Sequence, residues 1–366
     1  MMSFEEFKGS VADSIKNHLP EKYEDAEISI STVTKNNDTK LTGITLKQED
    51  SNVSSCIYLN DYYKAYEEGT DFDELIKKLA EVYVSNDNKE YDVNQLTDFE
   101  DVKDKISCRV INAENNEEYL KDKPHTDIED LAVVYSVVLG KEDDGIYSVM
   151  VDNRMLNTYG ITVNELHETA VDNMSKQDVS FKTMRDTVME MMFPNGVQVN
   201  DPFLAMMMPP EDEIPEIYVL TNDTGVYGAS EILNTSFMDE IATQLGGDYI
   251  VLPSSVHETL IVPMSEEVDR ETLEGLVQEV NGEAVRPADR LSDHVYQYDS
   301  KNHEIVRMDR MEERERSVAK ETKSHDKSEE KTSLMDRISK KQDEISKKDS
   351  SHEHKPPTKN REEALA

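Results

Sequence analysis

The residue types best suited to nucleophilic or acid–base chemistry lie together in one short segment. Residues 253–258 read Pro-Ser-Ser-Val-His-Glu, so two hydroxyls, an imidazole and a carboxylate fall within six positions. A serine nucleophile needs a base within hydrogen-bond distance and donors for an oxyanion, but neighbours along a strand point to opposite faces. Two interpretations follow: a hydrolase-like site, or a tight turn with the histidine hydrogen-bonded in the core. The candidate catalytic residues are Ser254, Ser255, His257 and Glu258.

Two His-Glu pairs, His167-Glu168 and His257-Glu258, match part of a zinc motif. A zincin helix needs a second histidine four residues after the first, so that both imidazoles reach one metal ion. Those positions hold Val171 and Ile261, and the first pair is therefore interpreted as a solvated helix surface. The chain also has no Gly-x-Ser-x-Gly elbow, no Gly-rich phosphate loop and no complete calcium loop. We expect no metal centre and no cofactor.

Methionines crowd residues 184–208, where prolines prevent a continuous helix. Thioether side chains are flexible and polarizable, which suits a surface that adapts to a partner. Three interpretations stay open: core packing, a plastic groove that binds a protein partner, and a soft Cu(I) site. We expect a mobile surface segment or a lid over an apolar groove. The candidate partner-binding residues are Met191, Met192, Met206, Met207 and Met208.

The elements that would position these residues begin with a predicted α-β-β-β-α-α domain over residues 1–125. Ser3 and Glu6 make a capping box at the start of a helix whose apolar residues recur at helical spacing. The polar stretch 35–38 is typical of a turn between two strands. The predicted strands are 27–34, 41–47 and 53–59, and further helices are predicted from Asn60 and from Thr70.

A domain boundary is placed at residues 121–126, where proline, charge and loss of periodicity coincide. Residues 126–308 are expected to form a second domain, in which Thr162 and Glu165 make another capping box. The predicted elements are strands 131–139 and 146–152, a helix after 162, a helix near 181–193, strands 216–220, 226–232, 249–252 and 256–262, a helix near 270–280, and a strand pair near 294–307.

The order of hairpin and capped helix occurs at 131–173 and again at 216–245, which is a weak internal repeat. Alternating hairpins and helices favour an α+β fold with two lobes of mostly antiparallel sheet and packed helices. Residues 309–366 are poor in aromatics and rich in Lys, Glu and Ser, which predicts a disordered, charged tail. The exception is a helix near 333–348 that forms transiently or on a partner.

Charge is distributed unevenly along the chain. There are 78 acidic and 40 basic residues, and the whole excess of 38 negative charges lies in residues 1–308 because the tail carries 15 of each sign. Binding to nucleic-acid backbones needs a basic footprint, so we expect no such contact, and no docking on an anionic membrane. Solubility is the simplest interpretation. An acidic surface that imitates nucleic acid is the alternative.

The chain shows neither a secretory signal nor an apolar run long enough to span a bilayer, which predicts a cytoplasmic protein. Its two cysteines, Cys56 and Cys108, both lie in strand-like runs. Isolated thiols in such runs are typical of small core residues in a reducing compartment. We therefore expect both side chains to be buried and not joined by a disulfide.

Three segments together resemble one family of unknown function. They are the run Asp-Ile-Glu-Asp-Leu-Ala-Val-Val-Tyr at 127–135, the pattern Leu-x-x-Tyr-Gly-Ile-Thr-x-x-x-Leu-His at 156–167, and Leu-Pro-Ser-Ser-Val-His-Glu at 252–258. The resemblance covers about residues 1–308 and not the tail. It implies an origin in Gram-positive anaerobes, often as cargo of mobile elements, and it carries no established activity.

The favoured function is therefore a non-enzymatic, cytoplasmic accessory factor that binds a protein partner, with a possible role in a mobile element. This expectation rests on the incomplete catalytic motifs and on the methionine-rich stretch. A hydrolase-like enzyme that uses His257, Glu258 and one of Ser254 or Ser255 is the first alternative. An acidic mimic of nucleic acid is the second. The oligomeric state and the identity of the partner are left open by the sequence.

Overall fold

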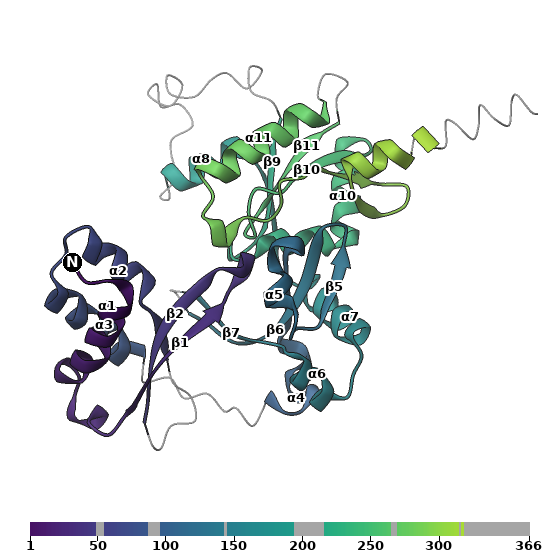
Figure 1. Cartoon of the computed structure of the whole chain (residues 1–366). Helices are drawn as coiled ribbons and strands as arrows, with labels where there is room; N and C mark the ends of the chain where they lie inside the picture. The colour runs from purple at the N-terminus through teal and green to yellow at the C-terminus, as the bar shows by residue number, and fades with distance from the viewer. Residues whose placement is uncertain are drawn as a thin grey trace, which may run out of the picture. The chain divides into compact units, whose positions relative to one another are not determined.

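The computed structural model describes residues 1–48, 55–86, 96–142, 145–193, 216–264, 269–314 and 316–317 (Figure 1). Residues 1–308 form one compact unit. The predicted α+β class is confirmed, because every strand pair among the described residues is antiparallel and helices pack on the sheets. The predicted tail helix near 333–348 and most of the predicted disordered tail lie outside the described residues.

The first sheet is a three-stranded antiparallel sheet near the N-terminus. Helix α1 (Phe4–Ser14) begins at the predicted capping box, in which the Ser3 and Glu6 side chains each bond the other's backbone N–H. The strands follow in the order β1-β2-β3. The elements are β1 (Glu27–Thr34), β2 (Lys40–Lys47), β3 (Cys56–Tyr58), α2 (Asn60–Glu67) and α3 (Phe72–Asn86). A separate core of buried apolar residues, centred on Phe7, Ile44 and Leu79, joins these helices to the sheet.

The second sheet has four strands and crosses the predicted domain boundary. Strand β4 (Ile106–Asn112) pairs with β6 (Leu131–Glu142), so segments from both sides of residues 121–126 share one sheet. The division into lobes at that boundary stays a prediction. The other elements are α4 (Phe99–Val102), α5 (Glu117–Leu120), β5 (His125–Ile128), β7 (Gly145–Met150), α6 (Asn153–Tyr159) and α7 (Val163–Met174). Strands β5 and β7 both pair with β6.

The third sheet has six strands in the order β13-β12-β10-β11-β9-β8. Its elements are β8 (Val179–Thr183), α8 (Met184–Met192), β9 (Tyr218–Asn222), the 3-10 helix η8 (Gly228–Leu233), α10 (Thr235–Leu245), β10 (Tyr249–Leu252), β11 (Thr259–Pro263), α11 (Arg270–Glu283), β12 (Tyr296–Asp299) and β13 (Glu304–Arg307). The main core lies between this sheet, the second sheet, α7 and α10. Helix α11 packs on the opposite face through Leu273 and Val277.

The predicted strand 226–232 is wrong, because most of that segment forms the 3-10 helix η8. A Cβ atom on Gly228 would lie 2.0 Å from Oγ1 of Thr221 and 2.6 Å from the carbonyl oxygen of His257. The preceding Tyr227 has a positive φ of 55°. The chain therefore turns tightly against its neighbours here, and the predicted repeat of a second hairpin before α10 is not formed.

Two smaller expectations also fail. The helix predicted near 181–193 starts later, since its first residues belong to strand β8. Both cysteines are free as expected, but only Cys108 is buried and Cys56 is exposed. Cys56 occupies the first position of the short strand β3, where its side chain lies over Gly43 of the neighbouring strand.

Candidate functional site

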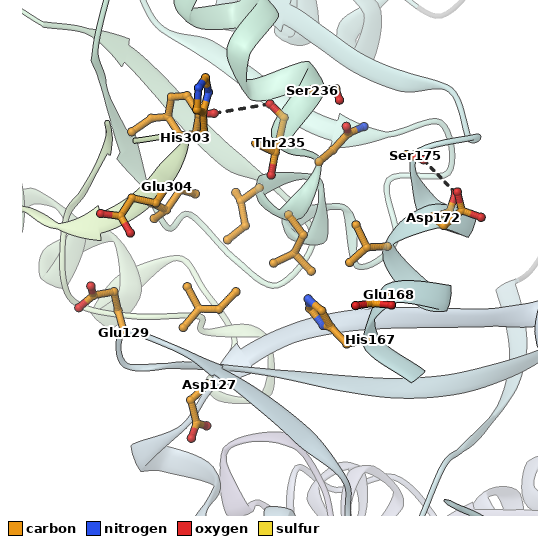
Figure 2. A pocket seen from close by; sticks show the side chains of 17 residues that line it. Asp127, Glu129, His167, Glu168, Asp172, Ser175, Thr235, Ser236, His303 and Glu304 are labelled. Atoms are coloured by element: carbon orange, nitrogen blue, oxygen red, sulfur yellow. Dashed lines mark hydrogen bonds between the residues drawn. The ribbon is translucent and has the colours of Figure 1, made fainter. Parts of the chain in front are cut away.

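A pocket of about 700 Å³ opens where the second and third sheets meet. Its walls come from four places: the β5–β6 turn, helix α7, the junction of η8 and α10, and the β12–β13 hairpin (Figure 2). Carboxylates, imidazoles and hydroxyls stand at its edges, while aliphatic side chains occupy its middle. The aliphatic lining residues are Ile128, Val171, Ile232, Leu233 and Ile305.

Helix α7 forms one side of the pocket because its buried residues recur every four positions and so hold one face of the helix against the core. Leu166, Ala170 and Met174 are buried and hold the helix against the core. The next residue along each turn lies beside that buried stripe, which places His167 and Val171 in the pocket wall. The predicted capping box of Thr162 and Glu165 is present and fixes where the helix begins.

His167 is the imidazole that points into the pocket from α7 (Figure 2). Its Nδ1 atom lies 3.0 Å from the hydroxyl of Tyr135, and that hydroxyl lies 2.6 Å from Oγ1 of Thr126. Partial burial lowers the pKa of His167, while the nearby Glu168 carboxylate acts in the opposite direction. Because the pKa is lowered, His167 is neutral at pH 7 and adds no positive charge to the pocket.

The second imidazole, His303, is held by a carboxylate of α10. Its Nδ1 atom lies 2.8 and 2.9 Å from the two carboxylate oxygens of Asp239. The Tyr298 hydroxyl donates to the same carboxylate at 2.7 Å. Hydrogen bonds from Tyr298 and His303 lower the pKa of Asp239, so this group stays ionised. His303 itself has a positive φ of 59° at the end of the β12–β13 turn.

Five carboxylates line the pocket, and no lysine or arginine is among the lining residues. Asp172 pairs with Lys176, which follows the end of α7, at 2.6 Å. In Figure 2 the carboxylates of Glu129 and Glu304 stand at one end of the pocket, and Glu168 and Asp172 stand towards the other. The lining carboxylates are Asp127, Glu129, Glu168, Asp172 and Glu304. The pocket therefore combines an acidic rim with an apolar middle.

The β5–β6 turn that carries Glu129 is held in place by a network of buried hydrogen bonds to the next residue, Asp130. Asp130 accepts hydrogen bonds from the Tyr296 hydroxyl and from Oγ of Ser292, each at 2.7 Å. Burial and then the Asp130 charge raise the pKa of Tyr296 well above its usual range, so its hydroxyl stays a donor. These bonds hold the turn of the second sheet against strand β12 of the third sheet.

The sequence-predicted catalytic residues lie elsewhere, in the β10–β11 connection. Nδ1 of His257 accepts the backbone N–H of Tyr227 at 3.2 Å, and its Nε2 lies 3.6 Å from a carboxylate oxygen of Asp289. Ser255 Oγ accepts the backbone N–H of His257, and Ser254 Oγ donates to Glu258 at 3.4 Å. These hydrogen bonds pair polar groups of the turn with one another. None of them joins the imidazole ring to the side chain of either serine. A catalytic role for this segment stays a prediction, and the hydrogen bonds do not favour it.

The candidate partner-binding methionines are only partly described. Met191 and Met192 lie at the end of α8 with 77% and 52% of their surface exposed. Met206, Met207 and Met208 lie outside the described residues. The partner-binding role of this stretch therefore stays a prediction.

Neither a metal cluster nor a spanning helix is found in the described part of the chain. The residues that the structure describes contain no group of three or more His, Cys, Asp or Glu side chains that could hold a metal ion. No helix among them is both long enough and apolar enough to cross a membrane.

Sequence reasoning did not identify the pocket. Its walls are drawn from residues between 127 and 305, and no short motif links them. The pair His167-Glu168 was interpreted as a solvated helix surface, which is correct for the exposed Glu168 but not for the half-buried His167. The one signal in the sequence was the position of this pair beside the buried stripe of α7.

Comparison with curated proteins and with solved structures finds no significant match. The profile of one protein family, described as a family of unknown function, does match this chain, over residues 4–300. That match covers the three sheets except strand β13, and it covers the pocket lining except His303, Glu304 and Ile305. It agrees with the resemblance to an uncharacterised family and says nothing about the source of the chain. The chain belongs to the family of unknown function DUF5688.

Proposed function

We propose that this protein is a binding protein, and that its acidic pocket takes a positively charged polypeptide segment that also carries apolar residues. The observation that supports this proposal is the composition of the lining: five carboxylates, no lysine or arginine, and five aliphatic side chains in the middle. A ligand with basic side chains on either side of an apolar residue matches this arrangement in charge and in polarity.

The charge of the whole protein supports the same class of ligand. The excess of 38 negative charges lies in residues 1–308, which include the pocket. A field of one sign attracts an oppositely charged partner and increases its association rate, most strongly at low ionic strength. His167 is neutral at pH 7 because its pKa is lowered, so it does not oppose a cationic ligand.

Affinity would come from apolar burial as much as from charge. The rim carboxylates Asp127, Glu168 and Glu304 are exposed, and ion pairs at exposed positions contribute roughly 0–1 kcal/mol each. Burial of the ligand's apolar side chains against the aliphatic middle contributes about 25 cal/mol per Å². Salt should therefore weaken binding without abolishing it.

The test compares two synthetic peptides of equal length by fluorescence anisotropy with the full-length protein. One peptide alternates lysine with leucine, and the other alternates glutamate with leucine. A pocket variant, Asp127→Asn with Glu168→Gln and Glu304→Gln, removes three rim charges. A matched control, Glu21→Gln with Glu279→Gln and Glu283→Gln, removes three exposed charges outside the lining.

We expect the lysine peptide to bind and the glutamate peptide not to bind. We expect the pocket variant to lose at least tenfold in affinity and the control variant to change less than twofold. Equal losses in the two variants would mean that only the overall charge matters, and would contradict a site at the pocket. The cytoplasmic location and the role in a mobile element that the sequence predicts are to be tested in the native cell.

A further inference from the structure

Strand β1 forms an open edge of the first sheet. The strand order β1-β2-β3 leaves β1 with one neighbour, and its eight residues, Glu27–Thr34, pair with β2 along their whole length (Figure 1). In the described part of the chain it is the longest edge strand, since the others have three to seven residues. None of its residues lines the acidic pocket, so this edge is separate from the proposed binding site for a basic polypeptide.

The backbone of every second residue of β1 points away from β2. Leu46 of β2 bonds the Tyr83 hydroxyl through both its N–H and its C=O, and so does not bond its partner on β1, Ile28. Thr42 of β2 likewise bonds residues that follow β3, and not its partner Thr32. Bonded and non-bonded pairs alternate along an antiparallel ladder, which turns one residue in two towards the open edge. Among the described residues, none hydrogen-bonds to these outward backbone groups. The outward residues are Ile28, Ile30, Thr32 and Thr34.

Strand β1 also lacks the features that keep an edge strand unpaired. Folded proteins protect such edges with proline, lysine, a bulge or a short length. Residues 28–34 read Ile-Ser-Ile-Ser-Thr-Val-Thr, with no charge and no proline, and the register with β2 has no shift. Ile30 keeps 36% of its surface exposed, although its partner on β2, Ile44, is fully buried. An uncharged, exposed strand of this length is suited to pairing with a further strand.

A second copy of β1 matches this edge. Two copies related by a twofold axis perpendicular to the sheet run antiparallel and turn the same face of the strand to the same side. The register that pairs all four outward residues with one another places Ser31 on the axis, opposite Ser31 of the partner subunit. Ile28 then lies opposite Thr34 of the partner subunit, and Ile30 lies opposite Thr32 of the partner subunit. Each such pair exchanges two N–H···O bonds, so the whole length of β1 is used.

The same register brings opposite charges together at both ends of the paired strands. Glu27 lies opposite Lys35 of the partner subunit, because the backbone of Lys35 continues the strand with φ −113° and ψ −176°. Neither side chain has an ion-pair partner among the described residues, and Nζ of Lys35 lies 5.1 Å from the centre of the Tyr58 ring. Opposite charges across two strands stabilise their pairing, and like charges oppose it.

We propose that this protein forms a homodimer in which β1 pairs antiparallel with β1 of a second copy, centred on Ser31. The two three-stranded sheets then make one sheet of six strands, in which neither β1 edge is left open. The self-complementary register and the charges of Glu27 and Lys35 favour a second copy over an extended segment of another protein.

The first test introduces one cysteine on the axis of the full-length protein. All variants carry Cys56→Ser, because the exposed Cys56 lies over Gly43, which is the neighbour of Ser31 on β2. In Ser31→Cys the two new thiols face each other on Cα atoms about 4.5 Å apart, which a disulfide can span. Ser29→Cys is the matched control, because it is equally exposed on the same face but its two copies lie about 13 Å apart along the strands. Mild oxidation should join Ser31→Cys into a covalent dimer and leave Ser29→Cys unjoined.

The second test measures the dimer by analytical ultracentrifugation at physiological salt, which screens the repulsion between two acidic copies. Glu27→Lys should weaken the dimer about tenfold, and Glu27→Lys with Lys35→Glu should restore it. Thr32→Pro should abolish the dimer, because it removes an outward N–H that β2 does not use.

Circular dichroism checks the fold of each variant. The proposal is overturned if the Cys56→Ser background sediments as a monomer, as it would if the edge received a segment of another protein. It is also overturned if Ser29→Cys cross-links as readily as Ser31→Cys, or if the double charge exchange does not restore the dimer. If Thr32→Pro unfolds, the cysteine and charge variants still decide the matter. A monomer in these tests leaves the peptide titration of the acidic pocket unaffected, so the two proposals fail separately.

Discussion

The hydroxyl of Tyr135 lies 3.0 Å from Nδ1 of His167, in the wall of the acidic pocket. Tyr135 comes from the central strand β6 and is fully buried, whereas His167 comes from helix α7 and is half-buried. The contact at Nδ1 fixes the orientation of the imidazole ring in the pocket wall. It also links the core of the second sheet to the site that we propose binds a basic polypeptide.

The first prediction concerns the titration of His167. Burial lowers its pKa below the usual 6.5, so at pH values just below 6.5 the unfolded chain binds a proton that the folded chain does not. The neutral imidazole of His167 therefore makes its full contribution to the free energy of unfolding above pH 6.5. This contribution is lost as the pH falls towards the lowered pKa. Nuclear magnetic resonance should show a midpoint below 6.5 for His167. A midpoint above 6.5 would contradict the neutral imidazole in the pocket.

The second prediction concerns Glu231, whose pKa is raised to about 7 from 4.5. The folded chain keeps its proton between these values while the unfolded chain loses it, so the carboxylate destabilises the fold as the pH rises from 4.5 through 7. Glu231→Gln should therefore raise the free energy of unfolding at pH 8 by up to about 3 kcal/mol. The gain should vanish near pH 4. Urea denaturation at both pH values measures it, and a gain independent of pH would refute the explanation.

The third prediction concerns the hydrogen bonds between Asn37 and Asn116, which join the first sheet to the rest of residues 1–308. The backbone N–H of Asn37, at the tip of the β1–β2 hairpin, donates to Oδ1 of Asn116 at 2.7 Å, and Nδ2 of Asn116 donates back at 3.1 Å. Asn116 is fully buried and also donates to the carbonyl of Asn112. Asn116→Ala should cost about 2–3 kcal/mol, because it leaves buried polar groups unpaired.

The neighbouring Asn115 provides a matched control for the Asn116→Ala substitution. It is exposed, and its only described hydrogen bond uses its backbone N–H. Asn115→Ala should change the free energy of unfolding by less than about 0.5 kcal/mol. Urea denaturation of both variants compares them directly. Similar losses in the two variants would show that the hairpin tip is not held by the Asn116 side chain.

The fourth prediction uses two glycines in opposite environments. At Gly228 a Cβ atom would lie 2.6 and 2.7 Å from two backbone atoms, of His257 and Asn222, so Gly228→Ala should destabilise the fold strongly, by several kcal/mol. At Gly9, inside helix α1, nothing lies within 4 Å of a new Cβ. Gly9→Ala should stabilise the protein by about 0.5–1 kcal/mol. Thermal unfolding should give shifts of opposite sign, and a mild effect at Gly228 would contradict the close packing of η8.

Local signals in the sequence predicted much of the fold. The capping boxes at Ser3 and Thr162 start helices where expected, because a side chain and a backbone N–H three residues away suffice to form them. The segment 226–232 was mistaken for a strand because its apolar residues fit a strand equally well. What prevents the strand there is contact with Thr221 and His257, and a local pattern does not contain such contacts.

The candidate site was harder to predict than the fold. His257 attracted attention because hydroxyls and a carboxylate lie beside it in the sequence, yet its ring bonds the backbone of Tyr227, thirty residues earlier. The acidic pocket is assembled from four distant stretches, each of which looks like ordinary surface alone. Only the packing of α7 and the β12–β13 hairpin brings His167 and Glu304 to one cavity.

Carbodiimide cross-linking of the lysine–leucine peptide to the full-length protein tests the central claim most directly, because it joins a lysine amine to a carboxylate only where the two are in contact. Mass spectrometry of the digested product then identifies the carboxylates. The account predicts that the linked residues are concentrated on Asp127, Glu168 and Glu304, which line the pocket. Links spread equally over the exposed carboxylates of α11, such as Glu279 and Glu283, would contradict it.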